Sequence, residues 1–134
     1  MFEKSCFKFI EDKAYGMTTD TVEERTEKEH VLQKALIRAT LLPLTIAEYS
    51  LEGIRLMEQY AKKGSRLAVS DAGVGAVFCK SALQGDKLNV MINLKLMNEE
   101  GLKKELLDKM IAIEAEGLPL ADQIYKYVEE QLCC

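Results

Sequence analysis

The chain has 134 residues, of which 48% are apolar and 30% are charged, so its composition indicates one globular domain over residues 1–134. Eighteen Lys and Arg against 22 Asp and Glu leave a net charge of −4, which argues against a nucleic-acid partner because such proteins present a basic face. Two prolines, eight glycines and no tryptophan are poor material for a turn-rich β-sandwich or barrel.

The sequence also indicates a location away from membranes. No segment reaches the roughly 18 uninterrupted apolar residues that a membrane span needs, and the first residues lack the apolar stretch of a signal peptide. The four cysteines lack the spacing of metal ligands; Cys79 is predicted to be a small core residue, and Cys133 and Cys134 to lie in a tail whose role stays open. We therefore expect a cytoplasmic protein with no metal site.

The first predicted elements are a short amphipathic segment over residues 3–15 and a long helix from about Thr21 to Lys63. The long helix has cap candidates before it and two glutamates in its first turn. Pro43 lies inside the helix and predicts a kink or break there, because proline removes one backbone hydrogen bond. Gly64, after two lysines, predicts the end of the helix.

The next segment, residues 68–83, is built of small and apolar residues on nearly every side. A helix without a polar face normally lies at the centre of its bundle. The prediction is therefore full burial of four of its residues, Ala72, Val74, Ala76 and Val77.

A second apolar stretch at residues 88–95 follows Gly85 and Asp86. The last predicted helix covers about residues 99–132, with bends at Gly117 and Pro119. These elements predict an all-α fold, a multihelical antiparallel bundle of kinked long helices around residues 70–83.

Five polar residues are considered as candidates for catalysis or ligand binding. His30 stands alone in a polar stretch and is interpreted as a surface residue. Ser70 and Asp71 are either a helix cap with an acidic first turn or the polar floor of a pocket. Asn89 and Asn93, four residues apart, share one helix face and need partners if buried: backbone groups, each other across a dimer axis, or a polar heterocycle.

Three short motifs carry a family resemblance. The stretch SDAGV at residues 70–74, followed by LNV at 88–90 and INL at 92–94, resembles the cyclodeaminase family, which includes the cyclodeaminase part of formiminotransferase-cyclodeaminase and bacterial methenyltetrahydrofolate cyclohydrolases. The similarity covers nearly all of residues 20–133. Two features depart from the family pattern: the chain starts after the usual leading glycine-rich segment, and a Gly-Ser pair at 64–65 replaces a Gly-Asn turn.

The resemblance implies a multihelical fold and folate one-carbon chemistry without a metal or redox cofactor. Cyclodeaminases close 5-formimino-tetrahydrofolate to the 5,10-methenyl compound with loss of ammonia, and cyclohydrolases add water to the methenyl bridge. Proton transfer near the cationic carbon suits a carboxylate, for which Asp71 is the candidate. Asn89 and Asn93 are candidates either for hydrogen bonds to the pterin or for holding a dimer together. Ser70 is a further candidate for substrate binding, and Arg66 or Lys95 is the candidate for the glutamate tail.

The resemblance also implies a homodimer or a higher homo-oligomer. Two other interpretations stay open beside the folate enzyme. One is a non-catalytic helical dimerisation or interaction protein that kept the fold and lost part of the site. The other is a folate-binding module that completes its site with another chain.

Overall fold

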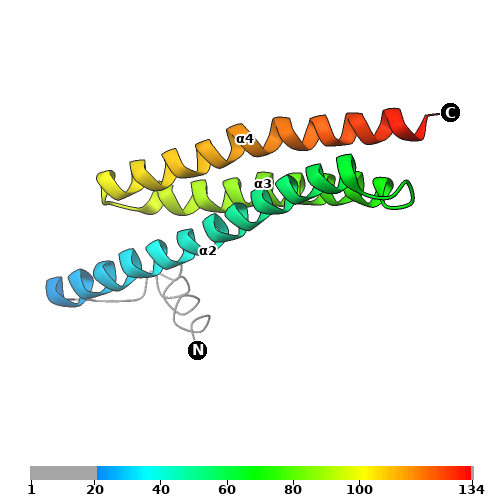
Figure 1. Ribbon diagram of the computed structural model, residues 1–134. Helices are drawn as coiled ribbons and strands as arrows, with labels where there is room; N and C mark the ends of the chain where they lie inside the picture. The colour runs from blue at the N-terminus through cyan, green and yellow to red at the C-terminus, as the bar shows by residue number, and fades with distance from the viewer. Residues whose placement is uncertain (1–20, 134) are drawn as a thin grey trace.

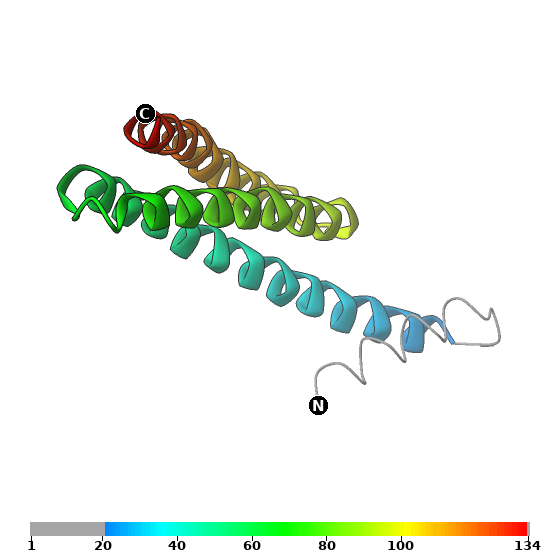
Figure 2. The ribbon, with the colours of Figure 1, turned by 90° about the vertical axis from the view of Figure 1, so that its right-hand side faces the viewer.

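A computed structural model describes residues 21–133, which fold into three helices and confirm the all-α bundle. The helices are α2 (Val22–Lys63), α3 (Val69–Leu96) and α4 (Glu100–Leu132), each antiparallel to the next. Helix α3 lies between α2 and α4 and packs against both (Figures 1 and 2). The expected segment at residues 3–15 lies outside the described residues. None of the three helices combines the length and apolar character that crossing a bilayer requires.

Helix α2 begins at the expected cap and continues through its proline. The Glu24 amide donates to the Thr21 hydroxyl at 3.3 Å, and the Thr21 amide donates to the Glu24 carboxylate at 2.8 Å, which completes a capping box. The alternative of a break at Pro43 is wrong, because this buried residue lies inside an uninterrupted helix. One missing hydrogen bond does not interrupt a 42-residue helix whose neighbouring turns pack into the core. Gly64 ends the helix, donating its amide to the Tyr60 carbonyl at 2.8 Å.

Helix α3 runs without a break through Gly85 and so contains both apolar stretches. Glycine lowers helix propensity by about 1 kcal/mol, but Leu83 and Val90 on either side are fully buried and hold the helix in the core. Helix α4 likewise contains Gly117 and Pro119 without interruption.

The small residues of α3 do allow close packing, as expected. A Cβ atom at Gly75 would lie 2.6 Å from Sδ of Met57 on α2, and one at Gly117 of α4 would lie 2.4 Å from Cδ1 of Leu83. Ala72 and Ala76 are buried, with exposed fractions of 2% and 0%.

The prediction of complete burial is wrong for two residues of α3. Val74 and Val77 keep exposed fractions of 54% and 42%. The physical reason is that α2 and α4 cover only the inner sides of α3 and leave its outer face to solvent.

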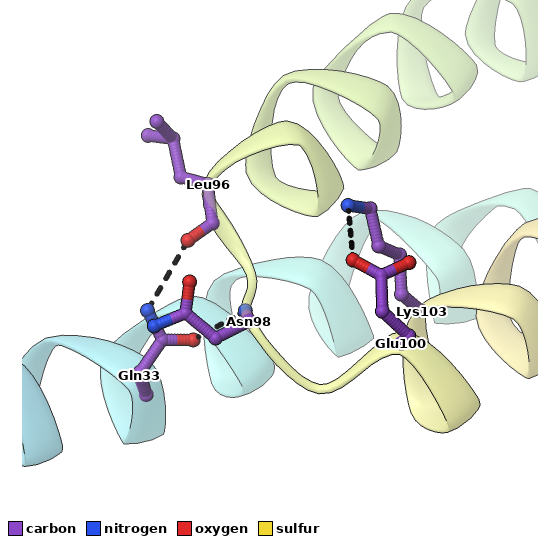
Figure 3. A network of polar contacts seen from close by, with 5 residues as sticks. All are labelled: Gln33, Leu96, Asn98, Glu100 and Lys103. Atoms are coloured by element: carbon purple, nitrogen blue, oxygen red, sulfur yellow. Dashed lines mark hydrogen bonds and ion pairs between the residues drawn. The ribbon is translucent and has the colours of Figure 1, made fainter.

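Polar contacts tie the turn between α3 and α4 to the first half of α2 (Figure 3). The Gln33 side chain donates to the Leu96 carbonyl at 3.2 Å and accepts from the Asn98 amide at 2.9 Å. Glu100 and Lys103 form an ion pair at 3.1 Å in the first turn of α4. Gln33 therefore satisfies backbone groups at the end of α3 that the helix itself leaves open.

Ion pairs link α2 directly to α4. Arg55 donates two hydrogen bonds to the Glu116 carboxylate, at 2.7 and 2.8 Å, and Lys109 contacts Glu48 at 2.5 Å. The hydrogen bond to Glu116 raises the pKa of Arg55, and the hydrogen bond from Arg55 lowers the pKa of Glu116. These pairs fix the relative position of the outer helices along their length.

Candidate functional site: a groove between α3 and α4

A largely apolar groove of about 560 Å³ lies between the first half of α3 and the last half of α4. A smaller hollow of about 210 Å³ lies between α2 and α4. The larger groove is lined by Ser70, Gly73, Val74, Val77, Phe78, Tyr125, Val128, Glu129, Leu132 and Cys133. Its size fits a small-molecule site.

The groove exists because α3 lies directly on α4 at Gly73. A Cβ atom at this position would lie 2.9 Å from Cγ1 of Val128. Phe78 on α3 and Tyr125 on α4 provide aromatic surface, and their exposed fractions are 71% and 50%. Aromatic side chains with this exposure offer flat apolar area to a ring-shaped ligand.

Two polar groups accompany the apolar walls. Ser70 is half-buried in the first turn of α3 and offers a hydroxyl that can donate and accept. Glu129 is exposed in the last turns of α4 and offers a carboxylate acceptor. The groove can therefore hold a flat apolar ring and meet hydrogen-bond donors on the edge of that ring.

The structure separates the roles of Ser70 and Asp71. Helix α3 begins after Ala68, which makes no side-chain cap, so the alternative of a cap at Ser70 is wrong. Asp71 is the acidic residue of the first turn, as that alternative also expected, but its side chain is exposed. Ser70 lines the groove and Asp71 does not.

The two asparagines lie far from Ser70 in the same chain. Asn89 is exposed, and the half-buried Asn93 donates from Nδ2 to the Ala39 carbonyl of α2 at 3.0 Å. At 1.5 Å per helical residue, Asn89 is about 27 Å from Asp71 along α3, and Asn93 is about 35 Å from Ser70. One chain therefore does not bring the predicted polar residues together.

The two cationic residues predicted for the glutamate tail also lie at opposite ends of α3. Arg66 is exposed in the turn between α2 and α3, beside the end of α3 that holds Ser70. Lys95 is exposed in the last turn of α3, at the opposite end of the helix.

Sequence reasoning missed Phe78, Tyr125 and Glu129 as lining residues. Tyr125 and Glu129 are four residues apart, a spacing that places them on one face of a helix and was available in the sequence. The sequence predicts that Phe78 belongs to a helix that is covered on all sides, whereas its side chain is exposed.

A buried carboxylate outside the groove is a further residue that sequence reasoning did not find. Asp86 on α3 is 8% exposed, and its Oδ2 atom has no hydrogen-bond partner. Burial raises the pKa of Asp86. Asp86 does not line the groove, so it bears on stability rather than on the groove's chemistry.

The remaining single residues largely agree with their predicted settings. Cys79 is half-buried against the core, and burial raises the pKa of its thiol. His30 is exposed, as predicted. Within residues 21–133, no three His, Cys, Asp or Glu side chains are arranged to hold a metal ion.

Comparison with known proteins gives consistent matches. Residues 9–112 match the family model described as formiminotransferase-cyclodeaminase. Methenyltetrahydrofolate cyclohydrolase of Methylorubrum extorquens is 33% identical over 119 residues, which cover 89% of this chain and 57% of the relative. Formimidoyltransferase-cyclodeaminases of Rattus norvegicus and Mus musculus are 28% and 30% identical, over 78% of this chain and 19% of each relative. The chain thus spans little more than half of the first relative and a fifth of the others.

Proposed function

This chain belongs to the formiminotransferase-cyclodeaminase family, and from that premise we propose that it acts in folate one-carbon metabolism, converting methenyl- or formimino-tetrahydrofolate. The similarity to the cyclohydrolase over 89% of the chain is the observation that carries the proposal. The groove between α3 and α4 is the proposed binding site for the folate.

The chemistry of the groove supports a pterin as its occupant. A pterin is a flat ring with hydrogen-bond donors along one edge, and it can lie against Phe78 and Tyr125 while that edge meets an acceptor. Glu129 is the lining residue whose carboxylate suits those donors, and Ser70 adds a hydroxyl.

The proposed chemical step is a proton transfer beside the bridging carbon. In the cyclohydrolase reaction, water adds to the cationic methenyl carbon and loses one proton. The remaining hydroxyl proton passes to one bridge nitrogen as the bond from that nitrogen to the carbon breaks, which leaves a formyl group on the other nitrogen. In the cyclodeaminase reaction, the N10 nitrogen outside the pterin ring attacks the formimino carbon and loses its proton, and the amino group of that carbon gains a proton and leaves as ammonia. Asp71 follows Ser70 in the first turn of α3 without lining the groove, and we propose it as the proton-transfer residue for a bridging carbon held at that end of the groove. No electrons are transferred in either reaction, so the proposal includes no redox cofactor.

A second candidate function is that of a non-catalytic helical interaction protein. The observation that favours it is the separation of Asp71 from Asn89 by about 27 Å along one helix. If the chain is an enzyme, Asp71 and Asn89 of one chain cannot contact the same small ligand. We therefore propose that the chain forms a homodimer or a higher homo-oligomer, in which Asn89 serves another subunit.

Incubation with 5,10-methenyl-tetrahydrofolate tests the proposal, with loss of its near-ultraviolet absorbance as the readout. We expect turnover by the wild-type chain, a large loss in Tyr125→Ala and Glu129→Gln, and normal turnover in the control Tyr49→Ala. Tyr49 is an exposed tyrosine on α2, away from the groove. Wild-type protein that neither converts the compound nor gains thermal stability from it would favour the interaction protein.

A further inference from the structure

Pro43 leaves one carbonyl group of α2 without its usual partner. In an α-helix each backbone amide donates to the carbonyl four residues earlier, and proline has no amide hydrogen to donate. The carbonyl that loses its donor is therefore that of Ala39. The proline ring also crowds this carbonyl. Ala39 thus offers an acceptor that helix α2 itself does not use.

The side chain of Asn93 on α3 supplies a donor to this carbonyl. Its Nδ2 atom donates to the Ala39 carbonyl at 3.0 Å, although the two residues are 54 positions apart in the sequence. A carbonyl oxygen only accepts hydrogen bonds, so the amide nitrogen of Asn93 faces it. Asn93 is half-buried, and Leu94 beside it is 4% exposed, so the core holds this turn of α3 in place. A hydrogen bond between α2 and α3 thus replaces the one that Pro43 removes within α2.

The Asn93 hydrogen bond lies in the same register as two close contacts between α2 and α3. A Cβ atom at Gly75 would lie 2.6 Å from Sδ of Met57, and one at Gly53 would lie 3.0 Å from Sγ of Cys79. From the first contact to the second, the position on α2 moves back by as many residues as the position on α3 moves forward. The same count, continued along both helices, leads to the hydrogen bond of Asn93. The packing of the two helices therefore brings this asparagine to the carbonyl that needs a donor.

We propose that Asn93 is a structural residue whose side chain takes the place of the backbone donor missing at Pro43. Of the two asparagines on α3, Asn89 is then the one that is open to a ligand. Asn89 is exposed, whereas the amide nitrogen of Asn93 is engaged within the chain. Only the statement about a ligand rests on the proposed function. The coupling between Asn93 and Pro43 does not depend on it.

A double-mutant cycle tests this coupling without any folate. Asn93→Ala removes the donor, and Asn89→Ala makes the same change at an exposed position of the same helix, which controls for the helix propensity of alanine. We expect the melting temperature of Asn93→Ala to lie a few degrees below that of Asn89→Ala. Pro43→Ala restores a backbone donor to the Ala39 carbonyl, so in that background the difference should shrink to less than about half. An equal difference in the two backgrounds would overturn the coupling.

The side-chain amide of Asn93 gives a second test, on the wild-type chain. A hydrogen-bonded amide proton exchanges with water more slowly than a solvated one. We therefore expect slower exchange of the side-chain amide in Asn93 than in Asn89, measured by nuclear magnetic resonance. Pro43→Ala should speed the exchange in Asn93, because a backbone amide then competes for the same carbonyl. Equal exchange rates of the two asparagines in the wild type would overturn the hydrogen bond.

Folate binding separates a structural role of Asn93 from contact with a ligand. We expect 5,10-methenyl-tetrahydrofolate to raise the melting temperature of Asn93→Ala by as many degrees as that of the wild type, because the ligand does not use this donor. Asn89→Ala should show a smaller rise. Loss of the rise in Asn93→Ala, with helical content unchanged, would overturn the structural role, and a full rise in Asn89→Ala would overturn the assignment of Asn89.

The outcome for the wild type distinguishes this proposal from the proposed function. A wild-type chain that neither converts the folate nor gains thermal stability from it would reject the proposed enzyme. The double-mutant cycle and the exchange rates would then decide the role of Asn93 by themselves, because neither measurement uses a folate.

Discussion

A structural and a catalytic role of Asp71 predict changes in different measurements, the melting temperature and the rate of conversion. As an exposed first-turn acid it interacts mainly with the helix terminus, so Asp71→Asn should shift the melting temperature by only a few degrees. As the proton-transfer group it contributes about 10²–10⁴-fold to the rate, so conversion of methenyl-tetrahydrofolate should fall at least about a hundredfold.

Absorbance kinetics and thermal unfolding on the same samples separate these roles. Asp108→Asn, which changes an exposed aspartate on α4, is the control and should keep normal turnover. Near-normal turnover of Asp71→Asn would remove Asp71 from the catalytic role.

The buried Asp86 predicts a pH dependence of stability with a definite sign. Burial raises the pKa of this carboxyl in the folded chain, so the folded state binds the proton more tightly than the unfolded state. Its favourable contribution is therefore present at low pH, and is lost as the pH rises from the unfolded pKa of about 4 through the folded value.

We expect Asp86→Asn to raise the free energy of unfolding at pH 7 by about 1 kcal/mol, because it removes the buried charge. The gain should shrink as the pH falls, because the raised pKa lets the wild-type carboxyl take up its proton more readily in the folded chain. Urea unfolding at a series of pH values measures both trends. An equal effect of Asp86→Asn at pH 4 and pH 7 would contradict a raised pKa, whatever its size.

At the scale of the helix, the packing of α3 against its neighbours depends on small residues. Ala76 has no exposed surface, and Gly75 beside it lies against Met57 of α2. Ala76→Leu adds three carbon atoms where α2 and α4 leave no room, and should lower the free energy of unfolding by about 1–3 kcal/mol. Ala112→Leu, at an exposed position on α4, is the matched control and should be nearly neutral. Chemical denaturation compares the two, and a neutral Ala76→Leu would argue against tight packing at the centre of the bundle.

At the scale of the whole molecule, the proposed homo-oligomer predicts a stability that depends on protein concentration. A dimer that dissociates on unfolding has a melting temperature that rises with concentration, because the partner acts as a bound ligand of the folded chain. Calorimetry of the wild type over a wide concentration range should show a rise of several degrees. A constant melting temperature of the wild type over this range would contradict a homo-oligomer whose assembly is coupled to folding.

The bounds of the helices were largely determined by the sequence, because they depend on local interactions. Thr21 and Glu24 form a cap from residues three positions apart, and Gly64 ends α2 by one short-range hydrogen bond. The family motifs around Ser70 and Asn89 likewise lie in the sequence itself. The sequence therefore predicts the all-α class, the start and end of α2, the extent of α4 and the family.

Tertiary structure alone decided which surfaces of those helices are covered. Local rules predict a kink or break at Pro43, yet burial of neighbouring side chains outweighs the local cost of this proline in α2 and of Gly85 in α3. Sequence periodicity shows that α3 has no polar face, but it cannot show how many neighbours the helix has. Two neighbours leave Val74 and Phe78 exposed, shape the groove with Tyr125, and keep Ser70 and Asn93 at opposite ends of one helix. Contacts between distant segments set these features, and so they become visible only when the chain is folded.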